Sequence, residues 1–253
     1  MSTGLKIEGR VALVTGANRG IGLALVEALQ ERGARKIYAG TRKPEALADL
    51  AGLSRGVVIP LRLDITDETE VRQAASQASD VDLLINNAGI VSHTFAGFED
   101  PIWLDAARRE YETNVLGSLR VSQAFVPVLA QQGGGTLVNV SSVAGLVGLP
   151  MLLTYSTTKA ALHSLTQSTR EMLQGQGTRV VGVYPGPVET EMSSKIPIPK
   201  ASSSSVAHAI LDGLELGLEE IYPDSFARQA GEVYAVNPKG LERQMAATSA
   251  ALD

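Results

Sequence analysis

Seven short apolar runs recur along the chain, separated by stretches with helical spacing. In the first of these stretches, Leu23, Val26 and Leu29 fall on one face of a helix. Strands that alternate with helices form parallel sheets, because each crossover places a helix on a face of the sheet. The pattern predicts an α/β fold with one doubly wound parallel sheet of about seven strands. The expected strands are residues 11–15, 37–41, 57–61, 81–86, 136–141, 180–184 and, more weakly, 220–222.

No linker rich in proline, glycine or serine divides the chain, so residues 1–253 are expected to form a single domain. The serines at 202–205 follow a proline-rich segment and indicate a loop leading into a helix, with Ser205 as its candidate cap. Thr66 is the candidate cap of a helix at 67–78. We expect residues 188–205 to include a substrate lid and residues 225–253 to be an irregular tail.

The charge and residue content exclude several classes of function. The net charge is −5, and no cluster of lysine and arginine suited to a nucleic-acid backbone occurs. There is no cysteine, and the three histidines lack the spacing of metal ligands, so no metal site is expected. No stretch approaches the roughly 20 apolar residues of a membrane span. A cytoplasmic protein without nucleic-acid or membrane partners is the expectation.

A glycine-rich turn follows the first expected strand and opens the first helix. Glycines let the backbone approach a pyrophosphate, and a helix start presents free amides to it. The spacing is GxxxGxG, which differs from the GxGxxG of the general dinucleotide motif. Such a turn can also be only a tight connection, but its place after the first strand favours cofactor binding. The candidate residues are Gly16, Asn18, Arg19, Gly20, Ile21 and Gly22.

The second expected strand ends at Thr41 and is followed by Arg42. Sites that prefer NAD place an acid there to hold the ribose 2′-hydroxyl, whereas an arginine can bind a 2′-phosphate. Arg19 is a second cation in plausible reach. The alternative is that Arg42 is a solvated surface charge. The sequence therefore favours NADP(H) over NAD(H).

Tyr155 and Lys159 would lie one turn apart on one face of a helix, thirteen residues after Ser142. A free phenol titrates near pH 10, so proton transfer near neutrality needs a pKa lowered by roughly 3 units. The charge of Lys159 is one way to supply part of that change. A surface tyrosine above a solvated lysine would show the same spacing, so the pair alone is a weak indication.

Together these features resemble the short-chain dehydrogenase/reductase family, from Arg10 to about Tyr222. The shared motifs are TGxxxGIG at 15–22, Asp64, Asn-Asn-Ala-Gly at 86–89, Asn114, Ser142, Tyr155 with Lys159, and Pro185-Gly186 with Thr190. The resemblance implies a Rossmann-type fold and a catalytic set of Asn114, Ser142, Tyr155 and Lys159. In that set Ser142 stabilises the oxyanion, Tyr155 is the acid or base, and Asn114 supports a relay water. Lys159 lowers the tyrosine pKa and holds the ribose.

The resemblance also implies roles in cofactor binding. Asp64 and Ile65 would read the adenine, although Asp64 could instead cap the next helix. Asn87, Ala88 and Gly89 would border the cofactor. Pro185, Gly186, Val188 and Thr190 would hold the nicotinamide carboxamide.

The implied activity is hydride transfer between NADP(H) and a carbonyl or alcohol group. Leu146, Leu149 and Met192 are candidate substrate contacts, which favours a small apolar ketone, aldehyde or alcohol. The alternatives are a catalytically idle NADP(H) sensor and a lyase or isomerase on the same fold. A homodimer or homotetramer is expected by analogy, although the carboxyl end departs from the common family pattern.

Overall fold

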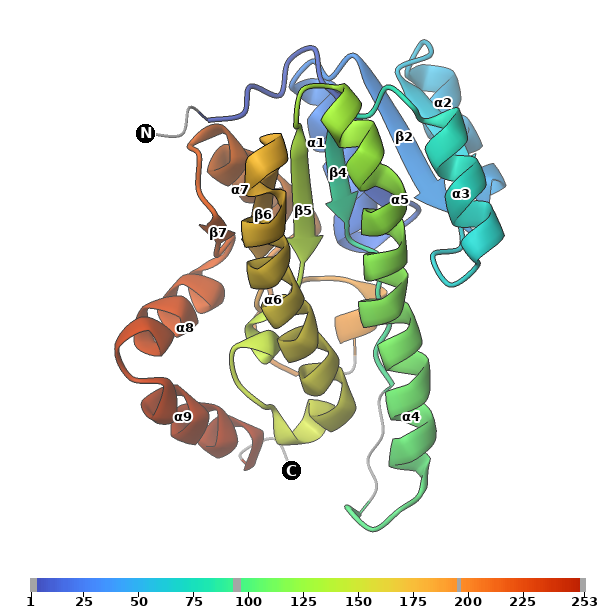
Figure 1. Cartoon of the computed structure of the whole chain (residues 1–253). Coiled ribbons are helices and arrows are strands. Elements are labelled where there is room, and N and C mark those ends of the chain that lie inside the picture. Colours follow the sequence, from blue (N-terminus) through green and yellow to red (C-terminus); the bar gives the residue numbers. More distant parts are fainter. Residues whose placement is uncertain (1–3, 93–96, 195–196, 251–253) are drawn as a thin grey trace.

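The computed structural model describes residues 4–92, 97–194 and 197–250. All strands lie parallel in one sheet with the order β3-β2-β1-β4-β5-β6-β7 (Figure 1). This confirms the predicted doubly wound α/β fold. The strands are β1 (Val11–Thr15), β2 (Lys36–Thr41), β3 (Val58–Arg62), β4 (Leu83–Asn86), β5 (Thr136–Val140), β6 (Arg179–Val183) and β7 (Glu220–Ile221).

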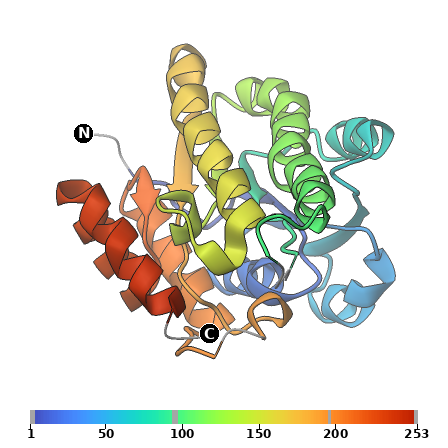
Figure 2. The same cartoon turned by 90° about the horizontal axis from the view of Figure 1, so that it is seen from below.

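Helices cover both faces of the sheet, with α1 and α7 packed together on one face and α3, α5 and α6 on the other (Figures 1 and 2). A π-helical turn, Glu112–Gly117, joins α4 to α5. The α-helices are α1 (Gly20–Glu31), α2 (Ala48–Leu53), α3 (Glu68–Gln77), α4 (Ile102–Tyr111), α5 (Ser118–Gln131), α6 (Leu153–Leu173), α7 (Ser203–Glu215), α8 (Ser225–Val236) and α9 (Pro238–Ala250).

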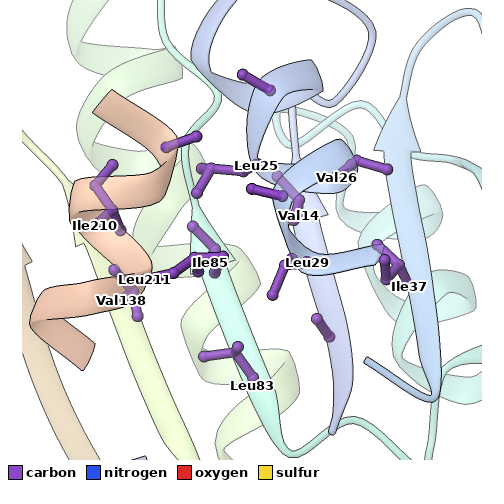
Figure 3. Packing of buried hydrophobic residues seen from close by; sticks show 14 of the residues in the cluster. Val14, Leu25, Val26, Leu29, Ile37, Leu83, Ile85, Val138, Ile210 and Leu211 are labelled. Atoms are coloured by element: carbon purple, nitrogen blue, oxygen red, sulfur yellow. The ribbon is translucent and has the colours of Figure 1, made fainter. Parts of the chain in front are cut away.

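Successive side chains of each strand point to opposite faces of the sheet, so a separate hydrophobic core forms on each face. In β1, Val14 packs with the α1 and α7 core, whereas Leu13 belongs to the core under α3 and α5. Figure 3 shows the first core, in which Leu25 and Leu29 of α1 and Ile210 of α7 meet the strands. Burial of such side chains contributes about 1.5–3 kcal/mol each. Both cores hold the sheet rigid, and its carboxyl edge carries the loops.

Two predicted helix caps are wrong by a few residues. The α3 helix is capped by Asp67, not Thr66, because the Asp67 carboxylate accepts from the amides of Thr69 and Glu70. Ser202, not Ser205, caps α7 and accepts from the Ser205 amide. In both cases the acceptor stands at the turn where the extended chain enters the helix. The last residues of the expected lid range therefore belong to α7, and residues 195–196 of that range lie outside the described residues.

The predicted irregular tail is also wrong, since α8 and α9 occupy most of residues 225–253. Asp224 caps α8 by accepting from the Ala227 amide at 2.8 Å. Asn237 accepts from the Gly240 amide at 2.8 Å, and Pro238 is the first residue of α9. A proline at that position suits a helix start, because the amide it lacks would be unpaired. The helices pack against each other, with Ala230 and Leu241 buried in a third core. Residues 251–253 lie outside the described part.

Candidate active site

A cleft of about 760 Å³ lies where the strands end. Strand order reverses between β1 and β4, and open α/β sheets bind ligands at such a point. Figure 2 views the molecule from this end. The cleft brings together every residue expected to bind the cofactor: Gly16, Asn18, Arg19, Gly20, Ile21, Gly22, Thr41, Arg42, Asp64, Ile65, Asn87, Ala88, Gly89, Tyr155, Lys159, Pro185, Gly186, Val188 and Thr190.

The glycine-rich turn is built for close backbone approach. Gly16 has φ +66°, and a Cβ there would lie 2.9 Å from the Ala88 Cα. A Cβ on Gly22 would lie 2.2 Å from the Gly16 carbonyl oxygen, so neither glycine can be replaced without movement. Arg19 precedes α1 and provides no side-chain cap, so no side chain from this position occupies the first-turn amides. Free amides at a helix start fit the phosphates of a dinucleotide.

The turn also touches the segment on the opposite wall of the cleft. Arg19 forms an ion pair with Glu191, and a Cβ on Gly20 would meet the Thr190 side chain at 3.1 Å. The base of that segment is held by a bridge between Val188 and Ala201. Both side chains of the Arg19–Glu191 ion pair are exposed, so we expect the pair to contribute less than about 1 kcal/mol to the stability of the fold. Arg19 is consequently engaged by the facing wall in this structure.

The far end of the cleft carries the groups expected to hold the adenosine. Arg42 is exposed, and its guanidinium donates no hydrogen bond to another described residue. Asp64 accepts from the backbone and hydroxyl of Thr66 at 2.9 and 2.7 Å, an interaction that keeps it apart from the α3 cap. Burial raises the pKa of Asp64, but the Thr66 hydrogen bonds and the nearby charge of Arg42 outweigh it and hold that pKa below its usual value.

Asn87 and Ala88 join the ends of β1 and β4 beneath the cleft. Both of their amides donate to the Thr15 hydroxyl at 3.0 Å, and the Asn87 amide nitrogen Nδ2 donates to the Thr15 carbonyl at 2.9 Å. These bonds satisfy polar groups that the strand ends would otherwise bury unpaired. They fix the floor on which a cofactor would lie.

Ser142, Tyr155 and Lys159 meet in the cleft. The Lys159 Nζ lies 5.6 Å from the centroid of the Tyr155 ring and donates to the Val140 carbonyl at 2.9 Å. The Ser142 hydroxyl donates to the Pro185 carbonyl at 3.4 Å and lies near enough to Tyr155 to lower the pKa of the phenol, whereas the Ser141 hydroxyl donates to the Lys159 carbonyl. Ser142 is therefore the serine that presents its hydroxyl to the phenol.

The pKa values in this site differ from expectation. Burial raises the pKa of Tyr155 to about 12; a hydrogen bond with Ser142 lowers it, and the charge of Glu110 raises it further. Burial lowers the pKa of Lys159 to about 8. Lys159 is not among the causes of the change at Tyr155, so its effect on the tyrosine pKa stays a prediction.

Asn114 lies behind the cleft and does not line it. It is fully buried in the π-helical turn. Its side chain accepts from the Ile90 amide at 2.8 Å, and donates to the Ile90 carbonyl at 2.9 Å and the Thr158 hydroxyl at 3.0 Å. The Ser118 hydroxyl donates to its backbone carbonyl at 3.0 Å. Asn114 thus ties the loop after β4 to α6.

The loop after β6 is fixed from the carboxyl-terminal side. The Gly186 amide donates to Asp224 at 2.8 Å, and the Pro185 carbonyl accepts from the Val143 amide at 3.0 Å. Because Asp224 also caps α8, one carboxylate joins this loop to that helix. The sequence motif located the loop, but its anchor could not be recognised while α8 was expected to be irregular.

The substrate end of the cleft is lined by some of the residues expected to contact substrate and by others. Leu149 and Met192 line it, whereas Leu146 does not. Leu146 directly follows the short 3₁₀ turn Val143–Gly145. The lining residues that the sequence reasoning missed are Leu152, Phe226, Met245 and Thr248. The last three belong to α8 and α9, and their helical spacing was the available signal.

The described residues contain no group of three or more His, Cys, Asp or Glu side chains arranged to hold a metal ion. No helix among them combines the length and apolar character that crossing a bilayer requires.

The sequence and fold match known proteins. A model of the short chain dehydrogenase family matches residues 10–200. A short-chain dehydrogenase of Burkholderia cenocepacia, solved in complex with NADP, is 41% identical with a TM-score of 0.87, over 95% of this chain and 99% of that one. An uncharacterized oxidoreductase of Myxococcus xanthus is 38% identical over 191 residues, which is 73% of this chain and 74% of the relative. The 3-oxoacyl-acyl-carrier-protein reductase of Thermotoga maritima is 34% identical over 201 residues, 76% and 80% of the two chains. With most of its motif residues gathered in one cleft and a family match across most of its length, the chain belongs to the short-chain dehydrogenase family.

Proposed function

We propose that the protein is an NADP(H)-dependent oxidoreductase that interconverts small or medium apolar carbonyl compounds and their alcohols. The observation that carries this proposal is the meeting of Ser142, Tyr155 and Lys159 in the same cleft as the glycine-rich turn and Arg42. The NADP complex of the Burkholderia cenocepacia relative supports the choice of cofactor. The presence of all these groups speaks against an idle sensor, which would not need the tyrosine.

The residues of the cleft suit cofactor binding and proton transfer. Bound NADPH would supply the hydride. Gly16, Gly20 and Gly22 leave room for the phosphates, and Lys159 would hold the ribose hydroxyls. Ser142 donates a hydrogen bond to the carbonyl oxygen as negative charge develops there, and the Tyr155 hydroxyl delivers a proton to it. In alcohol oxidation the same hydroxyl, once ionised, accepts the proton.

The test is a screen of NADPH oxidation against aldehydes, cyclic and aromatic ketones, ketoesters and steroids, followed by absorbance. We expect turnover with apolar ketones or aldehydes. Cofactor binding without turnover across the whole panel would contradict the proposal and favour the sensor.

Arg42→Asp tests the cofactor preference. We expect the wild type to bind NADPH more tightly than NADH, because Arg42 can pair with the 2′-phosphate. The substitution should lower the NADPH to NADH affinity ratio by about tenfold to a hundredfold, the value of a charge-assisted hydrogen bond of about 1.5–3 kcal/mol. Fluorescence titration with each cofactor measures the ratio.

Arg35→Asp is the matched control, because Arg35 is an exposed arginine just before β2, at the end opposite Arg42. It makes the same change of charge away from the cleft and should leave the ratio unchanged. Equal ratios in wild type and Arg42→Asp would show that Arg42 is only a surface charge.

Met245→Trp tests the substrate wall. Met245 is buried in the core under α8 and α9 and also lines the cleft. A larger side chain there should raise KM for bulky ketones while small aldehydes are still reduced, because overfilling a packed site costs about 1–3 kcal/mol. Steady-state kinetics on a size series measures this. Met172→Trp, at a side chain that is 80% exposed on α6, is the control; equal effects of both variants would contradict the assignment.

A further inference from the structure

The neighbouring strands β6 and β7 are each followed by a Tyr-Pro pair, at residues 184–185 and 222–223. Because the strands are parallel and in register, the two tyrosines lie side by side, and their rings stack with centroids 5.4 Å apart. Gly186 follows the first pair and Asp224 the second. The two segments therefore leave the sheet together, one along the cleft and the other into α8 (Figure 1).

The Asp224 carboxylate takes the place of a backbone carbonyl where the two segments leave the sheet. Alternate amides of the β6 segment donate to carbonyls of the β7 segment, ending with the bond from Tyr184 to Ile221 at 2.9 Å. With the same spacing, the Gly186 amide would reach the backbone carbonyl of residue 223. It donates instead to Oδ2 of Asp224 at 2.8 Å. A side chain thus replaces the backbone as acceptor, so this bond depends on which residue occupies position 224.

The same carboxylate holds the start of α8. Its other oxygen, Oδ1, accepts from the Ala227 amide at 2.8 Å. Asp224 is only 7% exposed. Hydrogen bonds to an ionised acceptor are stronger than those between neutral groups. Asp224 therefore joins the loop after β6 firmly to the first turn of α8.

The two segments that Asp224 joins form different walls of the cleft. The loop at 185–190, the nicotinamide loop, includes the residues expected to hold the nicotinamide carboxamide. Phe226 of α8 and Met245 of α9 line the substrate end. The segments are in close contact, because a Cβ on Gly186 would lie 2.8 Å from both Asp224 Oδ1 and Phe226 Cδ1. A shift of the nicotinamide loop would therefore move the substrate wall with it.

We propose that Asp224 is a positioning residue that couples the nicotinamide loop to the hairpin of α8 and α9, so that binding of the nicotinamide positions the substrate wall. This rests on the proposed function, which puts the nicotinamide at the loop. Asp224 does not line the cleft, so it acts through Gly186 and α8 and not on the substrate. Because coupling between two sites is reciprocal, a bound substrate also holds the nicotinamide loop in place.

Asp224→Ser removes one of the two bonds and keeps the other. A serine already caps α7, where Ser202 accepts from the amide three residues further on at 3.1 Å. Serine at position 224 can cap α8 in the same way, but it has no second oxygen for the Gly186 amide. The matched control is Asp82→Ser, because the Asp82 carboxylate accepts from the Val11 amide at 3.0 Å, at the opposite end of the sheet. Thermal midpoints report whether each variant is folded.

Two ligands separate the ends of the cofactor: NADP⁺, and adenosine 2′,5′-bisphosphate, which has no nicotinamide. Hydrogen–deuterium exchange in the hairpin of α8 and α9 of the wild type should slow with NADP⁺ and not with the bisphosphate. In Asp224→Ser this response should be lost. The affinity ratio of NADP⁺ to bisphosphate should fall about tenfold, as the loss of one hydrogen bond to a charged group would give. Asp82→Ser should match the wild type in both measurements.

Either of two results would overturn the proposal. One is an unchanged hairpin response in Asp224→Ser, and the other, which needs no variant, is equal slowing of exchange by both ligands in the wild type. In steady-state kinetics at saturating NADPH, Asp224→Ser should raise KM for a ketone more than it lowers kcat, because Ser142 and Tyr155 lie outside both joined segments. If NADP⁺ binds but no carbonyl compound is reduced, the proposed function fails, while the exchange measurements still decide the role of Asp224.

Discussion

Tyr155→Phe is expected to abolish carbonyl reduction while leaving NADPH binding unchanged. The substitution removes one hydroxyl, and the ring that packs beside Lys159 remains. General acid catalysis contributes roughly a hundredfold to ten-thousandfold in rate, so kcat should fall by that amount. Because the ring is retained, the cofactor dissociation constant should stay within the error of a fluorescence titration. Stopped-flow reduction at saturating NADPH gives the rate.

Tyr111→Phe is the control for this change. Tyr111 ends α4 and is exposed, so removal of its hydroxyl should leave the rate as it is. A Tyr155→Phe enzyme that turned over at a near-normal rate would exclude the phenol as the proton donor. Ser142 would then be the next candidate for the proton donor.

Lys159→Met is expected to destroy activity and to stabilise the fold at neutral pH. Lys159 is 4% exposed, and its pKa falls from 10.5 to about 8. The difference of about 2.5 between these values corresponds to about 3 kcal/mol of destabilisation when the amine is charged. Loss of the hydrogen bond to the Val140 carbonyl offsets part of this gain, so the free energy of unfolding should rise by about 1–2 kcal/mol in Lys159→Met. Urea unfolding at pH 7 measures it.

The pH dependence gives the sign of this effect independently. Below pH 8 Lys159 is charged in the folded protein although burial disfavours that charge, so the full destabilisation applies. Between pH 8 and 10.5 the folded lysine has lost its proton while the unfolded one retains it, so stability rises with pH. Above pH 10 the raised pKa of Tyr155 reverses the trend. The difference between wild type and Lys159→Met should therefore shrink from pH 8 upward.

Lys6→Met provides the comparison, since Lys6 is exposed and pairs with Glu8 near the amino terminus. It should change neither activity nor stability appreciably. A Lys159→Met protein that was less stable than wild type at pH 7 and showed the same pH dependence would contradict the buried-charge account. Retained NADPH affinity in that variant would also exclude contact between Lys159 and the ribose.

The sequence predicted the strands closely because their signal is local. A buried parallel strand must be apolar throughout, so runs such as 37–41 differ from β2 by one residue. Several motif residues were found for a related reason: Gly16, Asn87, Ser142 and Pro185 stand just after strands, where the topology requires a loop. The tail was expected to be irregular although Pro238 begins α9, because a proline is found both in loops and at the first position of a helix.

Features that depend on contact between distant elements were not predictable in this way. The lowered pKa of Lys159 follows from burial between α6 and the end of β5, which no spacing reveals. Leu146 was expected at the substrate end, but it does not line the cleft.

The residues expected to bind the cofactor lie in the part of the chain that the family model matches, whereas the hairpin of α8 and α9 adds cleft residues from outside that part. The family match ends at residue 200, whereas Phe226, Met245 and Thr248 contribute to the cleft from beyond it. Relatives that share the first part can therefore diverge freely in what they accept, by exchanging one helical hairpin. Relatives with similar sequences in α8 and α9 should therefore prefer similar substrates, whereas similarity in the motif residues should not predict the substrate.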